Sequence, residues 1–186
     1  MRYSIGQGVE KALDLMMAAE YTGALVALRP ALDETARRYY KAYRQGTKHS
    51  VRFLEKHGSL IGKIGLEDAE IGKRDFVFPP LDRLFIRRKH SFGRVIYYFM
   101  KQKEKNRKRK IQLLWDRNAS LRIIREHCVI LDPMLISGII ASVVSCRVNE
   151  QEVLSRHHWL PSSVVQTPIN DLWGKAGELR QKINME

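Results

Sequence analysis

Two arginine–histidine pairs in this chain have the spacing Arg-x4-His: Arg44 with His49, and Arg122 with His127. A histidine can act as a general acid or base, and an arginine can stabilise the charge that develops on a pentacovalent phosphate. One such pair would suffice for metal-independent cleavage of RNA through its own 2′-hydroxyl group. This chemistry requires both side chains to reach the same phosphate.

The elements that carry these pairs decide whether the side chains can meet. Residues 111–130 show the alternating pattern of a β-hairpin, and an odd offset along a strand puts two side chains on opposite faces. Arg122 and His127 are therefore not expected to cooperate. Arg44 and His49 lie at a predicted turn between two helices, where they can converge. They are the candidate catalytic pair.

The positive charge is concentrated in one stretch. Residues 83–110 carry +11 of the net charge of +13, with twelve Lys or Arg against the single acid Glu104. Clustered basic side chains displace counterions from a phosphate backbone, which predicts nucleic acid as the partner. We expect phosphate contacts from Arg87, Arg88, Lys89, Arg94, Lys101, Lys103, Lys105, Arg107, Lys108, Arg109 and Lys110.

Two other interpretations of the basic stretch stay open. It could be a solvated surface without a ligand, or an arm that contacts anionic lipid or an acidic protein. Tyr97 and Tyr98 could stack on exposed bases if they face outward, or they could belong to the core.

The apolar spacing predicts one mainly α domain over residues 1–186, a helical bundle with a small β-hairpin insertion near residues 111–130. We expect a cap at Thr22 and a kink or break near Arg29, because Pro30 removes a backbone donor. The predicted helices cover residues 9–20, 22–43, 50–64, 91–100, 134–148 and 170–184, residues 66–90 form a long excursion, and residues 116–119 form the turn of the hairpin.

Other kinds of chemistry find little support. The N-terminus lacks a secretory signal and no apolar run is long enough for a membrane span, which predicts a cytoplasmic protein. Cys128 and Cys146 are expected to be buried free thiols. His157 and His158 are expected to form a loop pair near a buried Trp159, with no acidic ligand at a suitable spacing. No metal site and no cofactor are predicted.

Several segments resemble the HEPN (higher eukaryote and prokaryote nucleotide-binding) group of all-α proteins, in an uncharacterised bacterial branch. They are residues 24–40 (ALVALRPALDETARRYY), residues 131–140 (LDPMLISGII) and residues 170–175 (NDLWGK). The resemblance implies a helical bundle that forms homodimers, with an Arg-x4-6-His motif that faces its symmetry mate. Toxins and antiviral or CRISPR-associated ribonucleases belong to this group.

The chain departs from the motif of that group. The motif would be expected after the aromatic residues 97–100, where this chain offers Lys101 and Asn106 at the same four-residue gap. Lysine keeps the positive charge, but asparagine cannot transfer a proton near neutral pH. The resemblance therefore implies a protein that binds nucleic acid, RNA more than DNA, and has a degenerate ribonuclease site. The alternatives are an active endoribonuclease of toxin or defence type, using Arg44 and His49, and a scaffold or regulatory protein with a basic arm.

Overall fold

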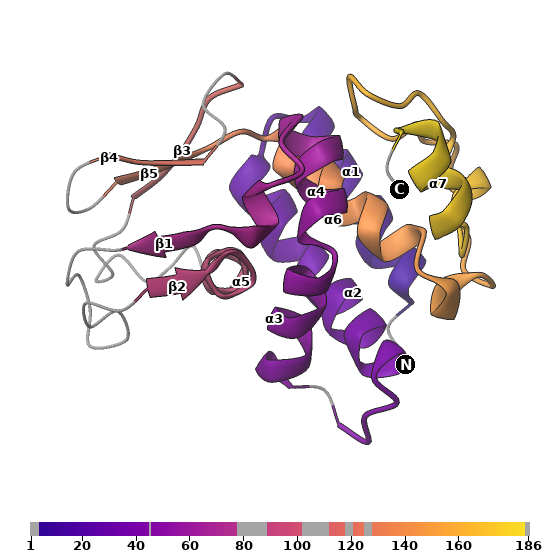
Figure 1. Ribbon diagram of the computed structural model, residues 1–186. Helices are drawn as coiled ribbons and strands as arrows, with labels where there is room; N and C mark the ends of the chain where they lie inside the picture. Colours follow the sequence, from indigo (N-terminus) through magenta and orange to yellow (C-terminus); the bar gives the residue numbers. More distant parts are fainter. Residues whose placement is uncertain are drawn as a thin grey trace.

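The structure is a computed structural model, and it describes residues 4–44, 46–77, 89–101, 112–117, 121–124 and 128–184. This part of the chain is mainly helical, with seven α-helices, as the sequence predicts. The strands gather at one end of the molecule and the last helix, α7 (Ala176–Lys182), lies at the other (Figure 1). No helix in the described ranges combines the length and the apolar composition that a membrane span requires.

The core is built around α6 (Met134–Val144). Every residue of α6 after Met134 is buried, in agreement with its nearly uniform apolar sequence. The helix begins where predicted, because a carboxylate oxygen of Asp132 accepts a hydrogen bond from the Met134 amide at 2.8 Å. It packs mainly against α4 (Gly58–Leu66) and also against α2 (Tyr21–Tyr39), which pairs with α1 (Ile5–Met17).

The helix predicted over residues 50–64 is two helices, α3 (Thr47–Lys56) and α4, separated at His57. Next to the break, the chain packs tightly against a later segment. A Cβ atom at Gly58 would lie 2.6 Å from the Cα atom of Gly72, in the 3-10 helix η1 (Ile71–Lys73), so the two backbones touch there. The separation leaves α3 free to pack against α2 and against α5 (Phe92–Met100).

Other helix ends differ from the sequence expectations. The break considered near Arg29 is absent, since α2 runs through Pro30 without interruption. Thr22 lies inside α2 rather than capping it, and its hydroxyl accepts a hydrogen bond from Trp115 Nε1 at 2.9 Å. The last two predicted helices are shorter, because the 3-10 helices η2 (Arg147–Asn149) and η3 (Ile169–Asp171) replace their ends.

The predicted hairpin over residues 111–130 is wrong in its pairing. Three strands form here, β3 (Gln112–Trp115), β4 (Leu121–Ile124) and β5 (Cys128–Leu131), in the order β3-β5-β4. The central strand β5 is parallel to β3 and antiparallel to β4. Val129 and Leu131 of this central strand are buried in the core. The excursion at residues 66–90 contributes β1 (Asp75–Val77), antiparallel to β2 (Lys89–Ser91).

Candidate nucleic-acid interface

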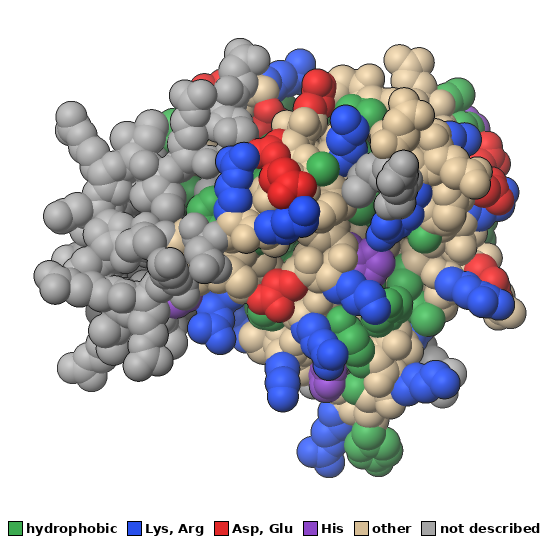
Figure 2. Space-filling view, in the orientation of Figure 1, with side chains coloured by type: hydrophobic (Ala, Val, Ile, Leu, Met, Phe, Trp, Pro, Cys, Tyr) green, Lys and Arg blue, Asp and Glu red, His purple; other side chains and the backbone are tan. Residues whose placement is uncertain are grey.

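A basic stripe runs along the exposed side of α3. Lys48, Arg52 and Lys56 are four residues apart, so they lie on one face of the helix, and all three are exposed. The opposite side of α3 buries Phe53 and Leu54. None of the three cations forms an ion pair within the part of the chain that the structure describes. Figure 2 shows Lys and Arg side chains spread over the lower part of the molecule, around α3 and the turn that precedes it.

Tyrosine rings hold two of these cations in place. The Arg52 guanidinium lies 5.1 Å from the centre of the Tyr40 ring, and the Lys56 ammonium lies 5.1 Å from the centre of the Tyr39 ring. Hydrogen bonding to Tyr39 raises the pKa of Lys56. Lys56 therefore stays positively charged, and aromatic faces rather than carboxylates position Arg52 and Lys56.

The arginines in the last turn of α2 are in a different state. Arg37 binds Glu34 through two hydrogen bonds of 2.6 and 2.8 Å. Arg38 binds Glu34 at 3.1 Å and also Glu152, at 2.9 Å. Acidic partners thus satisfy these two arginines, whereas the α3 stripe keeps its charge available to a ligand.

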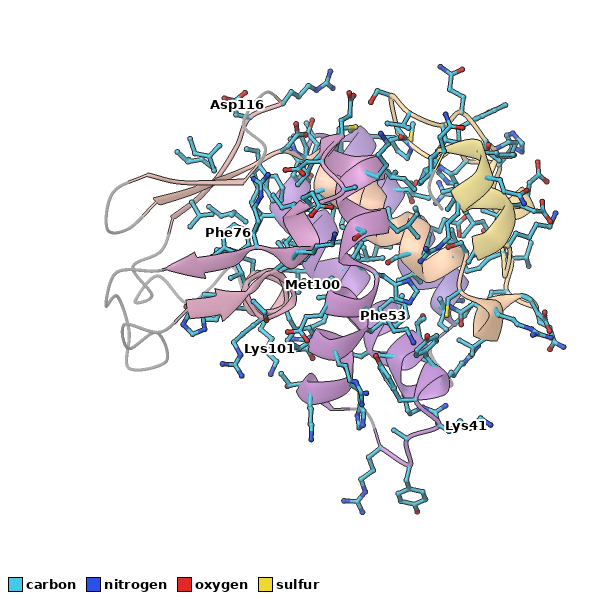
Figure 3. The ribbon with its side chains drawn as sticks, in the orientation of Figure 1. Lys41, Phe53, Phe76, Met100, Lys101 and Asp116 are labelled. Carbon is cyan, nitrogen blue, oxygen red and sulfur yellow. The ribbon has the colours of Figure 1, made fainter. Side chains whose placement is uncertain are left out.

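Lys101 joins the predicted basic run to this face. It follows the last residue of α5, and its Nζ atom donates a hydrogen bond to Thr47 Oγ1 at 2.8 Å. The ammonium also lies 5.2 Å from the centre of the Tyr97 ring. Figure 3 shows Lys101 beside α3, with Lys41 at the lower end of the molecule. Arg94 is exposed on α5.

A buried polar network fixes α3 against its neighbours. Asp33 of α2 accepts hydrogen bonds from the Ser50 hydroxyl at 2.5 Å and from the Tyr97 hydroxyl at 2.9 Å. Arg29 Nε lies 3.9 Å from the other oxygen of Asp33. Burial, together with the Asp33 charge, raises the pKa of Tyr97. This network joins α2, α3 and α5 below the basic stripe, and so it sets the position of that stripe.

The two tyrosines of α5 differ in how far they are accessible to a nucleic-acid base. Tyr97 is buried, so it is a core residue and is not available to stack on a base. Tyr98 is half-buried, and its ring contacts Phe99 edge to face at 5.6 Å. Of the two interpretations open for Tyr97, the structure supports the core.

The candidate catalytic pair makes no direct contact among the described residues. Arg44 is exposed in the α2–α3 turn, with its guanidinium 5.9 Å from the centre of the Tyr43 ring. His49 lies in the first turn of α3, with its ring 5.9 Å from that of Tyr40. The described structure contains no hydrogen bond or ring contact between Arg44 and His49, and His49 Nδ1 is buried without a hydrogen-bond partner there.

Much of the predicted phosphate-binding run lies outside the described residues. The predicted contacts outside the described residues are Arg87, Arg88, Lys103, Lys105, Arg107, Lys108, Arg109 and Lys110. Asn106 of the degenerate motif and His127 also lie outside them. Lys89 belongs to β2 and Arg122 to β4 through their backbones. Of the expected contacts, Arg94 and Lys101 have described side chains. The degenerate motif is thus described at Lys101 and not at Asn106.

Sequence reasoning missed the α3 stripe and Asp33. The stripe had a readable signal in the sequence, namely three basic residues at four-residue spacing. No sequence pattern pointed to Asp33, because its partners Ser50 and Tyr97 are 17 and 64 residues away along the chain.

The histidine pair differs from its expected setting. Trp159 is 55% exposed rather than buried. His158 Nε2 lies 3.8 Å from Asp14 and 4.0 Å from Glu10, two carboxylates of α1. Arg156 already binds Glu10 through its backbone amide at 2.8 Å. Among the residues that the structure describes, no group of three or more His, Cys, Asp or Glu could hold a metal ion.

Comparisons with known proteins add a family to this description. No match is found among curated proteins or among solved structures. A family model described as Rv1289 matches residues 4–186. That range includes the α3 stripe, Lys101 and the buried network around Asp33. Since the match covers nearly the entire chain, the protein belongs to the Rv1289 family.

Proposed function

We propose that this protein binds nucleic acid, RNA in preference to DNA, through α3, Lys101 and the basic run that follows Lys101. The α3 stripe carries the proposal, because its three exposed cations have no acidic partner in the described structure. Neighbouring stripe residues are about 6 Å apart along the helix axis, since each residue adds about 1.5 Å. A regular row of free cations suits a phosphate backbone.

The position of Lys101 supports one continuous surface. Its ammonium lies at the first turn of α3 while its backbone leads into residues 102–110, which hold six more Lys or Arg. A strand of nucleic acid could therefore contact the stripe and the run together. Such contacts supply affinity and orientation but carry no base sequence information.

We further propose that the domain is HEPN-like, homodimeric and cytoplasmic, with a ribonuclease centre that has lost its proton-transfer group. The helical bundle supports this, as does the lysine that directly follows the aromatic residues of α5. Purified protein is expected to leave single-stranded RNA intact in the presence of a chelator. Cleavage that disappears in His49→Ala would overturn this part and favour the active enzyme.

Binding across a salt series tests the main proposal. The triple variant Lys48→Glu, Arg52→Glu and Lys56→Glu should bind a labelled single-stranded RNA more weakly. Its log affinity should also depend less steeply on log salt, by roughly 2 in slope, because three phosphate contacts are lost. The matched control places the same change of charge at Lys11, Arg147 and Lys182, on other elements, and should bind like the wild type. Equal binding by the two triple variants, or affinity that does not change with salt, would refute the proposal.

A further inference from the structure

The turn that leaves α2 projects one aromatic side chain into solvent. The Ala42 amide donates to the Arg37 carbonyl at 2.9 Å, and the Lys41 amide donates to the Arg38 carbonyl at 3.1 Å. Lys41 has a left-handed φ of 49°, which completes a Schellman ending of the helix. Tyr43 follows directly, so its position is set by a defined turn.

The Tyr43 side chain is 93% exposed. Aromatic rings usually bury most of their surface, and Tyr39 and Tyr40 nearby do so at least in part. The contact found for the Tyr43 ring in the described structure is the Arg44 guanidinium, 5.9 Å from the ring centre. The ring is therefore open to a planar ligand.

Three cations lie close to Tyr43 in the sequence. Lys41 and Arg44 flank it, and Lys48 begins the basic stripe in the first turn of α3. None of the three forms an ion pair in the described ranges. A free aromatic face beside an arginine without an acidic partner, in a segment that holds further such cations, is typical of proteins that bind single strands, in which bases stack on rings while phosphates bind Lys and Arg.

We propose that Tyr43 stacks on an unpaired base, so that this interface takes single-stranded nucleic acid rather than a duplex. The inference rests on the proposed function. A duplex already stacks its bases on one another and offers none to Tyr43. Insertion of Tyr43 into a lipid headgroup layer is the competing idea. Membrane insertion is less favoured because the neighbours of Tyr43 offer little apolar area to bury. Residues 41 and 44 are charged, and residue 42 is an alanine.

The test compares Tyr43→Ala, Tyr43→Phe and wild type on a single-stranded oligonucleotide and on a duplex of the same length. Tyr43→Ala should bind the single strand about 5- to 150-fold more weakly and the duplex equally well. Tyr43→Phe keeps the ring and should bind like the wild type. Trp159→Ala, which removes an exposed aromatic side chain from another loop, should have no effect. Thermal unfolding would confirm that each variant is folded.

The outcomes separate this inference from the proposed function. If salt-dependent binding persists but Tyr43→Ala binds the single strand as tightly as the wild type, base stacking is refuted and nucleic-acid binding stands. If no oligonucleotide binds, the proposed function itself fails. Weaker binding of Tyr43→Ala to phosphatidylserine vesicles, with oligonucleotide binding unchanged, would assign the ring to membranes and overturn the inference.

Discussion

The ammonium group of Lys101 lies 2.8 Å from the hydroxyl group of Thr47, which connects the end of α5 to the first turn of α3. Two segments more than 50 residues apart thus place their charges on one surface. The bond is exposed, so its contribution to stability is small, whereas the position of the charge matters for binding.

Removing the Lys101 charge should weaken nucleic-acid binding with little effect on folding. Lys101→Gln is expected to reduce the steepness of the salt dependence by roughly 0.7, the share of one contact with a single strand. Thr47→Val deletes the acceptor but keeps the ammonium, and it should leave that slope unchanged. Anisotropy titrations at several salt concentrations measure both. A slope that moves equally in the two variants would show that the hydrogen bond, rather than the charge, is responsible.

Asp33 should be a major contributor to stability. Asp33→Ala leaves the buried hydroxyl groups of Ser50 and Tyr97 without their acceptor, and should lower the free energy of unfolding by about 3 kcal/mol. Tyr97→Phe removes one donor and should cost about 1 kcal/mol. Urea denaturation measures these changes. The exposed Asp171→Ala serves as a control, and a loss no larger than in that variant would contradict the role assigned to the network.

His57 should make stability depend on pH. Burial, with a smaller effect of the nearby charges Arg180 and Lys56, lowers the pKa of His57 from 6.5 to about 4. The unfolded chain therefore binds a proton at a pH at which the folded protein does not. Stability should be complete above pH 6.5 and should fall as the pH decreases to about 4, by on the order of 3 kcal/mol.

The comparison with His57→Leu isolates this contribution. Chemical denaturation at a series of pH values should give a shallower decline for the variant between pH 6.5 and 4. Parallel curves for the two proteins would show that His57 does not titrate as expected. His90, whose pKa burial also lowers, is present in both and cancels in the difference.

Glycine at position 19 should stabilise the protein. Ala19 has a left-handed φ of 59° at the end of α1, where its amide donates to the Met16 carbonyl at 3.0 Å. An L-residue with a Cβ atom is strained there, so Ala19→Gly should raise the free energy of unfolding by roughly 0.5–1 kcal/mol. The neighbouring Ala18→Gly, where φ is −80°, should lower it or leave it unchanged. A gain at both positions would mean that strain is not the cause.

Local patterns predicted the helices well. The apolar spacing in α1 and α5 and the uniform apolar sequence of α6 each reflect which side of a helix meets the core. Such patterns can be recognised within a single short segment of the sequence. The close approach of Gly58 to Gly72 beside the break between α3 and α4 joins two separate segments, so such patterns do not reveal it.

The candidate site was predictable in part for the same reason. Lys48, Arg52 and Lys56 share a face through local spacing, so the stripe could have been found in the sequence. The sequence could not show which arginines remain free, because Arg38 is paired with Glu152, 114 residues away. The charge of a segment predicts a polyanion partner, but tertiary pairing decides which side chains remain available to it.

The central place of β5 constrains how the sheet can form during synthesis. In the described structure β3 and β4 both pair with β5, and they do not pair with each other. Before residues 128–131 have been synthesised, the growing chain therefore contains β3 and β4 without the strand with which both of them pair. Closing the sheet requires a parallel, non-local contact, which is slower to form than a hairpin. Folding of this sheet must wait for β5, whereas α1 and α2 lie within residues 5–39 and are synthesised earlier.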